Sequence, residues 1–173
     1  MSSAGNSVKR RRAVLPEVVA QNPSALTISQ KLPDAIVDAQ MAVDGPVLFI
    51  APAHIVAVCR LLKDVGFESV AGITAVDWWP KNPRFEVVYL LNSLRQNARL
   101  RLVVRLAENE EIDSVCSVWR GANWYEREVF DLFGVIFRNH PNLERIMMPA
   151  DWEGHPLRKD YPVHGHRYSY QEE

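Results

Sequence analysis

Four prolines fall within 22 residues near the end of this 173-residue chain: Pro141, Pro149, Pro156 and Pro162. Proline has no backbone N–H and fixes φ, so it blocks both helix continuation and pairing inside a sheet. Segment 141–162 is therefore expected to be extended and to lie along the surface of a domain. Trp152 and Tyr161 are the side chains expected to hold it there.

A short helix is expected directly before this segment. Asn123 is a favourable N-cap, and the Glu126 carboxylate, three residues later, can reach back to the cap N–H and complete a capping box. Gly134 supplies the left-handed residue that ends a helix, and a short strand over 135–137 is expected to follow. Because Glu126 falls in the apolar sector, the alternative is a buried acid that needs a basic partner.

The other face of the expected helix is charged. A 100° step per residue groups Arg127, Glu128 and Asp131 beside Trp124. Asp131 lies near the helix C-terminus, where the helix dipole disfavours a carboxylate. Arg127, one turn earlier, could offset that charge, although this order of the two charges is the weaker one.

Residues 123–162 hold seven of the sixteen aromatic residues of the chain and twelve charged ones. A segment so rich in both types fits neither a plain core nor a plain solvated face. Arg158, Lys159 and Asp160 lie among prolines and aromatic residues, a combination typical of interface anchors. The segment is expected to be an interaction surface, and the alternative is an ordinary salt-bridged loop.

The preceding residues predict an α+β domain with a mostly antiparallel sheet and helices packed on one face. The expected elements are a strand at 47–50, a helix at 52–66, strands at 67–76, 85–91 and 99–106, and a helix at 112–119. The expected organisation is a mobile N-terminal tail (1–30), the α+β domain (31–122), the helix and extended docking segment (123–162) and a C-terminal tail (163–173).

Strand 99–106 alternates apolar residues with arginines, which predicts one covered face and one polar face. Arg99, Arg101 and Arg105 on the polar face could bind an anion. A solvated or partner-facing surface is favoured, because the aromatic residues of a nucleic-acid platform are missing. The net charge of −1 also disfavours nucleic acid as a partner.

Other classes of chemistry find little support in the sequence. No dinucleotide-binding or nucleoside-triphosphate motif occurs, and no apolar run is long enough to span a membrane. Cys59 and Cys116 are expected to be small buried residues, and two cysteines cannot supply the four ligands of an iron–sulfur cluster.

Catalytic and metal sites are also disfavoured. Glu126 and Glu128 diverge by about 160° around a helix, a poor geometry for an acid–base pair. His164 and His166, with His155, could chelate a metal, but histidines spaced in this way are more often solvated. We expect no catalytic residue, bound cofactor or metal in this chain. A small metal-dependent enzyme is the weakest alternative.

The order of residues in the last fifty positions resembles the signature of the 30 kDa subunit family (the C subunit) of proton-pumping NADH–quinone oxidoreductase, respiratory complex I. The matching residues are Glu126-Arg127-Glu128, Asp131, Phe133-Gly134, His140-Pro141, Leu143, Arg145-Ile146, Trp152, Gly154 and Pro156 to Pro162. A weaker resemblance extends back to about Val47, through the segment Ala75-Val76-Asp77-Trp78. Glu144 departs from the family pattern, which leaves the contact of that side chain open.

The resemblance implies a peripheral-arm subunit that packs against the 49 kDa-type subunit and has no activity alone. Flavin, iron–sulfur clusters and quinone are then expected in partner subunits. The location implied is the cytoplasmic face of a bacterial inner membrane, with the mitochondrial matrix side as a weaker alternative. The corresponding subunit of a membrane-bound hydrogenase or a coenzyme F420-type dehydrogenase is the nearest alternative. The expected docking residues are Glu126, Arg127, Glu128, Asp131, His140, Trp152, Arg158, Lys159, Asp160 and Tyr161.

Overall fold

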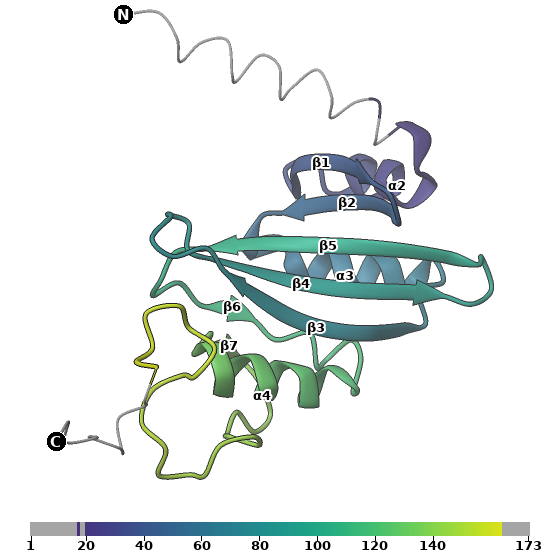
Figure 1. Cartoon of the computed structure of the whole chain (residues 1–173). Coiled ribbons are helices and arrows are strands. Elements are labelled where there is room, and N and C mark those ends of the chain that lie inside the picture. The colour runs from purple at the N-terminus through teal and green to yellow at the C-terminus, as the bar shows by residue number, and fades with distance from the viewer. Residues whose placement is uncertain (1–16, 18–19, 164–173) are drawn as a thin grey trace, which may run out of the picture.

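The computed structural model describes residue 17 and residues 20–163, and a five-stranded sheet forms its centre (Figure 1). The strand order is β1-β2-β5-β4-β3, with one parallel pair, β2 with β5, among antiparallel neighbours. The strands are β1 (Ile36–Ala42), β2 (Gly45–Ile50), β3 (Ser69–Asp77), β4 (Phe85–Ser93) and β5 (Ala98–Leu106). The predicted α+β class with a mostly antiparallel sheet is confirmed; the parallel pair was not predicted.

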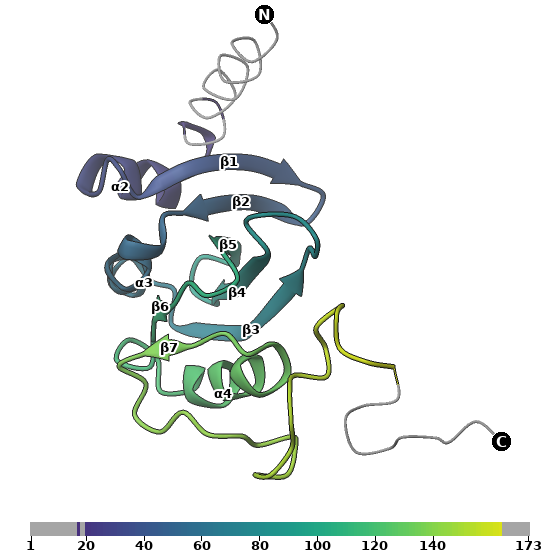
Figure 2. The ribbon, with the colours of Figure 1, turned by 90° about the vertical axis from the view of Figure 1, so that its left-hand side faces the viewer.

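The helices cover one face of this sheet, as predicted. Alternate residues of β5, including Leu102 and Val104, are buried against α3 (Ile55–Asp64). The buried residues of α4 (Ala122–Phe133), such as Val129, belong to the same core cluster as those of α3. Figure 2 shows α3 inside the curve of the sheet and α4 beside β3. One core therefore joins the two halves of the chain.

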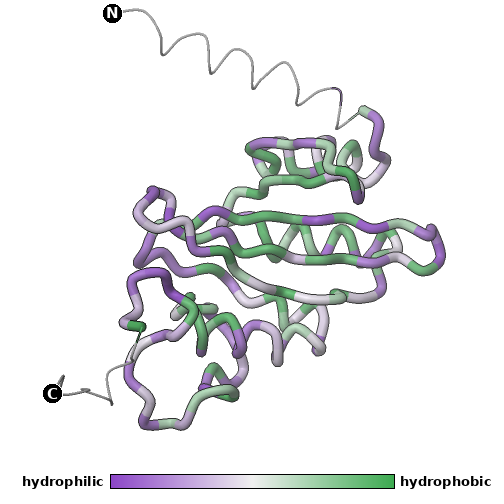
Figure 3. Tube along the Cα trace, viewed as in Figure 1, coloured by the Kyte–Doolittle hydropathy of each residue, from purple (hydrophilic) through white to green (hydrophobic). Residues whose placement is uncertain are grey.

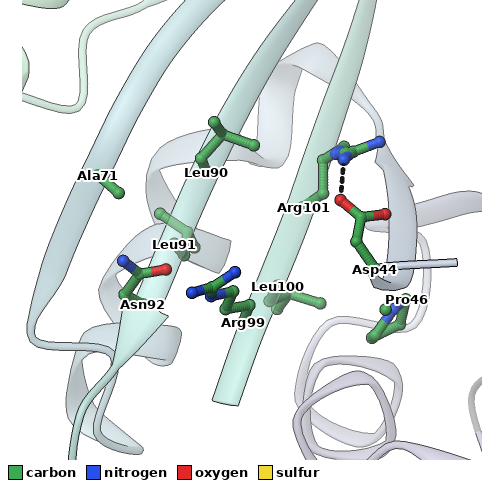
Figure 4. A pocket seen from close by; sticks show the side chains of 10 residues that line it. Asp44, Pro46, Ala71, Leu90, Leu91, Asn92, Arg99, Leu100 and Arg101 are labelled. Atoms are coloured by element: carbon green, nitrogen blue, oxygen red, sulfur yellow. Dashed lines mark hydrogen bonds and ion pairs between the residues drawn. The ribbon is translucent and has the colours of Figure 1, made fainter. Parts of the chain in front are cut away.

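Two of the three arginines predicted on the opposite face of the sheet have internal partners. Arg105 donates to Glu86 over 2.9 Å and stacks over the Phe49 ring, and Arg101 pairs with Asp44. A shallow hollow of about 260 Å³ lies beside the Arg101 pair, over β4 and β5 (Figure 4). Arg101 and Arg105 are therefore neutralised by carboxylates. Arg99, which also lines the hollow, is exposed and has no ion pair within the described residues.

The folded part begins earlier than the sequence predicted. Helix α2 (Pro23–Lys31) is capped by the Asn22 side chain, and its Ala25 and Ile28 are fully buried. Residues 23–30, the last part of the range expected to be a mobile tail, are therefore helical and packed on the core. Residues 1–16 and 18–19, including the basic run at 9–12, lie outside the described residues.

The prediction of a helix at 112–119 is wrong. Ile112–Asp113 forms β6, which pairs in parallel with β7 (Phe137–Arg138), and turns connect β6 to α4. Val115 and Trp119 are nevertheless buried, as the apolar spacing indicated. Cys59 is buried in α3 as expected, whereas Cys116 lies in the turn region and is only partly buried.

Residues 139–163, called the C-terminal segment below, contain no helix or strand, as their prolines predicted. They run along α4 and contain a mixture of hydrophilic and hydrophobic residues, in contrast to the mostly hydrophobic central strands (Figure 3). Among the described residues, no helix is both long enough and apolar enough to cross a membrane.

Candidate functional site

The C-terminal segment is fastened to the last turn of α4. The final carbonyl oxygens of a helix have no partner inside the helix and need external donors. Here the Asp131 carbonyl accepts from the His155 ring (3.0 Å), the Leu132 carbonyl from the Leu157 N–H (3.0 Å), and the Phe133 carbonyl from the Arg158 guanidinium (2.6 Å). The segment thus acts as a C-terminal cap for α4.

Gly134 ends α4 as predicted, with a φ of 75°. Packing requires glycine there as well. A Cβ atom at this position would lie 2.5 Å from both the His155 ring and the Arg158 guanidinium. The two side chains that cap the helix therefore occupy the space that a larger residue would need.

Asp131 fixes the middle of the segment from a buried position. Its Oδ2 accepts three consecutive backbone N–H groups, from Ile146 (3.0 Å), Met147 (2.7 Å) and Met148 (2.9 Å). Its Oδ1 accepts from Arg145 over 2.6 Å. Arg127 does not supply the partner of Asp131, because the groups that bind this carboxylate come from the C-terminal segment.

These contacts determine the charge state of Asp131. Burial alone would raise the pKa of this carboxyl group, but the N–H groups of Met148, Met147 and Ile146 and the Arg145 guanidinium outweigh burial. The pKa is therefore lowered, and the anion is the stable form. A buried charge is tolerable here because it is fully hydrogen-bonded.

Arg127 binds the start of the same segment. It donates to the Glu144 carbonyl over 3.0 Å and pairs with the Glu144 carboxylate over 3.2 Å, while its guanidinium lies 5.1 Å from the Trp124 ring centroid. Glu144, the departure from the family pattern, thus gains an internal partner.

Glu126 does not cap α4, because the helix begins at Ala122 with Gly121 as the N-cap. It is instead fully buried, as the alternative interpretation held. Its carboxylate accepts from the Ser114 hydroxyl (2.5 Å), the Val115 N–H (2.8 Å) and the Cys116 thiol (3.3 Å). These bonds tie α4 to the turns after β6.

The histidine nearest to Glu126 is His140, with 3.9 Å between its Nε2 and a Glu126 oxygen. Burial raises the pKa of Glu126 despite the donors around it, and burial lowers the pKa of His140. Both shifts favour the neutral forms over an ion pair. The basic partner that a buried Glu126 was expected to need is therefore only a neighbouring, mostly neutral imidazole.

Cys116, Glu126 and His140 could together hold a metal ion, since one ligand atom from each lies within 4.8 Å of the others. The hydrogen bonds of the imidazole oppose this. Its Nδ1 accepts the Asn142 N–H (3.1 Å), which leaves the ring proton on Nε2, the atom facing the other two residues and the Asn123 carbonyl. The geometry favours a hydrogen-bonded network. Of the histidines considered earlier, His155 caps α4, and His164 and His166 lie outside the described residues.

A buried arginine fixes the end of the C-terminal segment to the sheet. Arg84, just before β4, makes paired hydrogen bonds to Asp77 (3.0 and 2.9 Å) and to Asp160 (3.0 and 2.5 Å). It also contacts Glu108 over 2.6 Å. The Lys159 N–H adds a bond to Asp77 (2.9 Å). Such bidentate hydrogen bonds to carboxylates are the strongest contacts that a guanidinium group forms.

The arginine also controls the acidity of its partners. Burial would raise the pKa of Asp77, but the bonds from Arg84, Lys159 and Trp79 lower it to about 2. The Arg84 hydrogen bonds lower the pKa of Asp160, and the two aspartates raise the pKa of Arg84. Sequence reasoning gave no role to Asp77, Arg84 or Glu108, because Arg84 and Asp160 meet across 76 positions and nothing local marks such a contact.

The other expected docking residues are less committed to internal contacts. Glu128 is partly exposed and makes no hydrogen bond or ion pair within the described part of the chain. The side chain of Lys159 is exposed, and Trp152 and Tyr161 are partly buried, with the Tyr161 hydroxyl 3.4 Å from the Glu153 carbonyl. Asp160 and Arg158, in contrast, are held by Arg84 and the Phe133 carbonyl.

The chain is similar in sequence to proteins of a known family. Residues 48–167 match the model of the respiratory-chain NADH dehydrogenase 30 Kd subunit family. The NADH-quinone oxidoreductase C subunit of Geotalea uraniireducens (strain Rf4) is 41% identical over 153 residues, which cover 87% of this chain and 93% of the relative. The equivalent protein of Roseiflexus sp. (strain RS-1) is 46% identical over 136 residues, 76% of this chain and 78% of the relative.

Two solved structures share the fold. A chain of the membrane-bound sulfane sulfur reductase, an archaeal respiratory membrane complex, aligns with a TM-score of 0.67 and 28% identity, over 86% of this chain and 85% of that one. A trypsin-resistant fragment of Nqo5 aligns with a TM-score of 0.57 and 27% identity, over 76% of this chain and 98% of the fragment.

Proposed function

The chain belongs to the 30 kDa subunit family of respiratory-chain NADH dehydrogenase, and we propose that it is a docking subunit without a redox cofactor of its own. The complex it serves, NADH–quinone oxidoreductase, couples electron transfer from NADH to quinone with proton translocation. The chain is a peripheral-arm subunit of that complex.

The main support for this proposal is that the C-terminal segment has a fixed conformation although it contains no helix or strand. Buried Asp131 and Arg84 and the end of α4 hold the C-terminal segment in place, although it has no helix or strand of its own. Large apolar side chains nevertheless remain exposed on this side of the molecule: Trp124, Met147 and Leu157. Internal anchors combined with exposed apolar groups are what a preformed interface requires.

The expected docking residues divide into two groups under this proposal. Asp131, His140 and Asp160 hold the segment from within, and Arg127 and Arg158 link α4 to the segment. Glu126 supports this arrangement by tying α4 to the turns after β6. Glu128, Trp152, Lys159 and Tyr161 supply side chains to a partner. The partner proposed is the 49 kDa-type subunit, with contact to the membrane only through the complex. The location proposed is the cytoplasmic face of a bacterial inner membrane.

The chemistry of the chain supports a role without electron carriers. Its two cysteines are too few for a cluster, and burial raises the pKa of Cys116 to about 12, which disfavours the thiolate that metals bind. Flavin, iron–sulfur clusters and quinone are assigned by this proposal to neighbouring subunits.

The proposal is tested by isolating the tagged native chain from gently solubilised membranes and identifying the proteins that accompany it by mass spectrometry. Recovery of a 49 kDa-type subunit with flavin- and NADH-binding subunits is expected. Subunits of a sulfur reductase or hydrogenase in their place would favour the alternative raised by the sulfane sulfur reductase likeness. Stoichiometric flavin or iron–sulfur absorbance on the isolated chain would refute the docking role.

A further inference from the structure

The loop between β3 and β4 presents two tryptophans to solvent. Trp78 and Trp79 are 39% and 49% exposed as residues, although tryptophan is among the residues that gain most from burial. We infer that Trp78, Trp79 and Lys81, called the tryptophan ridge below, form a second contact surface for a protein subunit of the same complex. This inference rests on the proposed docking function and adds a surface outside residues 123–162.

The backbone of the ridge is fixed before any partner binds. The Trp78 N–H donates to the Arg84 carbonyl (2.8 Å), the Trp79 N–H to the Asp77 carboxylate (2.9 Å), and the Lys81 N–H to the Trp78 carbonyl (2.9 Å). Asp77 and Arg84 are themselves buried and paired with each other. A loop that is already ordered loses little conformational entropy on binding, which favours its use as an interface anchor.

The ridge is continuous with the C-terminal segment. One Asp77 oxygen accepts the Trp79 N–H and the other accepts the Lys159 N–H, so a single carboxylate holds both elements. Figure 1 shows the β3–β4 loop at the same end of the molecule as the last part of the C-terminal segment. A subunit that docks along that segment is therefore within reach of the indole rings.

The chemistry of the ridge indicates the kind of partner surface. The Lys81 ammonium lies 4.8 Å from the Trp78 ring centroid, and neither Lys81 nor Lys159 pairs with a carboxylate within the described residues. A groove of about 660 Å³ opens beside Trp79, and the acids in its wall, Glu108 and Glu110, already bond to Arg84 and to the Ala107 N–H. The complementary surface is an apolar side chain flanked by Asp or Glu.

A membrane surface is the other class of partner that selects tryptophan and lysine together. A protein partner is favoured for two reasons. The ridge adjoins the C-terminal segment, and it has a groove beside it that a partner side chain can fill, whereas binding to lipid headgroups requires no groove. Phosphatidylglycerol vesicles then serve as the probe for the membrane alternative.

The test compares variants in the intact complex isolated through a tag on this chain. Trp79→Ala and Lys81→Glu are expected to weaken retention of partner subunits about 10- to 30-fold, as loss of an interface anchor does. Leu94→Ala is the matched control, because Leu94 is 85% exposed in the β4–β5 turn at the opposite end of the sheet. The control is expected to retain partners within about twofold of wild type. A photoreactive residue placed at position 79 should cross-link to a partner subunit.

The outcomes separate this inference from the docking proposal. If the wild-type chain retains no peripheral-arm subunit, the docking proposal fails and the ridge inference with it. If wild type retains its partners and both ridge variants match Leu94→Ala, the ridge inference alone is overturned. If the ridge variants lose binding to phosphatidylglycerol vesicles but retain their partner subunits as wild type does, the ridge inference is overturned and a lipid surface is favoured. Melting temperatures of the isolated variants identify misfolding, and Lys81→Glu, at an exposed position, keeps the test decisive if Trp79→Ala unfolds.

Discussion

Asp77→Asn is expected to destabilise the chain by about 2 to 4 kcal/mol at pH 7. The pKa of Asp77 is lowered from 3.8 to about 2, and a difference of that size between folded and unfolded chains corresponds to about 2 kcal/mol. Removing one partner of a buried ion pair costs about 3–5 kcal/mol. Arg84 keeps Asp160 and Glu108 in the variant, which limits the loss.

The pH dependence of this effect has a definite sign. A carboxyl group whose pKa is lowered by folding stabilises the fold above its unfolded pKa, and that contribution disappears as the pH falls through the folded value. The difference between wild type and Asp77→Asn should therefore be constant from pH 7 to about 5. It should shrink between pH 4 and pH 2, the window between the two pKa values.

Urea unfolding followed by circular dichroism measures both quantities. Glu86→Gln is the matched control, because Glu86 pairs with Arg105 on the open face of the sheet. Such exposed pairs contribute at most about 1 kcal/mol. Equal losses in the two variants, or a loss in Asp77→Asn that persists at pH 2, would refute the assignment of Asp77 and Arg84 as the anchor of the C-terminal segment.

Three further variants test other contacts of the C-terminal segment and α4. Gly134→Ala should lower the free energy of unfolding by about 1–3 kcal/mol, because of its positive φ and the 2.5 Å contacts, and a loss below about 0.5 kcal/mol by urea unfolding would contradict that packing. Burial raises the pKa of Glu126, so wild type should exceed Glu126→Gln in free energy of unfolding by less and less as the pH rises from 4 to 7. This trend is opposite to that of Asp77→Asn. A difference in urea midpoints that does not change with pH would count against it. Arg158→Ala should lower both the melting temperature and partner retention, because the Arg158 side chain caps α4. An unchanged melting temperature would indicate that Arg158 contacts only the partner.

The sequence predicted those parts of the fold that depend on local patterns. Alternation over 99–106 predicted β5, and the glycine at 134 predicted the end of α4. Strand β1 was missed because it lies at the edge of the sheet and carries Asp38 and Gln40, which weaken its apolar pattern. An edge strand buries fewer residues, so its period is harder to detect.

The error at 112–119 has a tertiary cause. The apolar spacing there is compatible with a helix, and the residues concerned are buried as expected. The N–H of Val115 and the hydroxyl of Ser114, however, are both engaged by the Glu126 carboxylate, which lies in another element. A long-range acceptor that competes for backbone donors cannot be recognised from the local pattern.

Several residues of the stretch that resembles the family signature make contacts inside the molecule. Asp131, Arg145 and Asp160 belong to the stretch that resembles the family signature, and each is occupied by an internal partner. The exposed tryptophans of the β3–β4 loop lie outside that stretch, although Asp77 connects them to it. If the motif mainly fixes the shape of the segment, substitutions inside it should change stability and docking together. Substitutions on the tryptophan ridge should change docking alone, and the two classes of variant separate these roles within one chain.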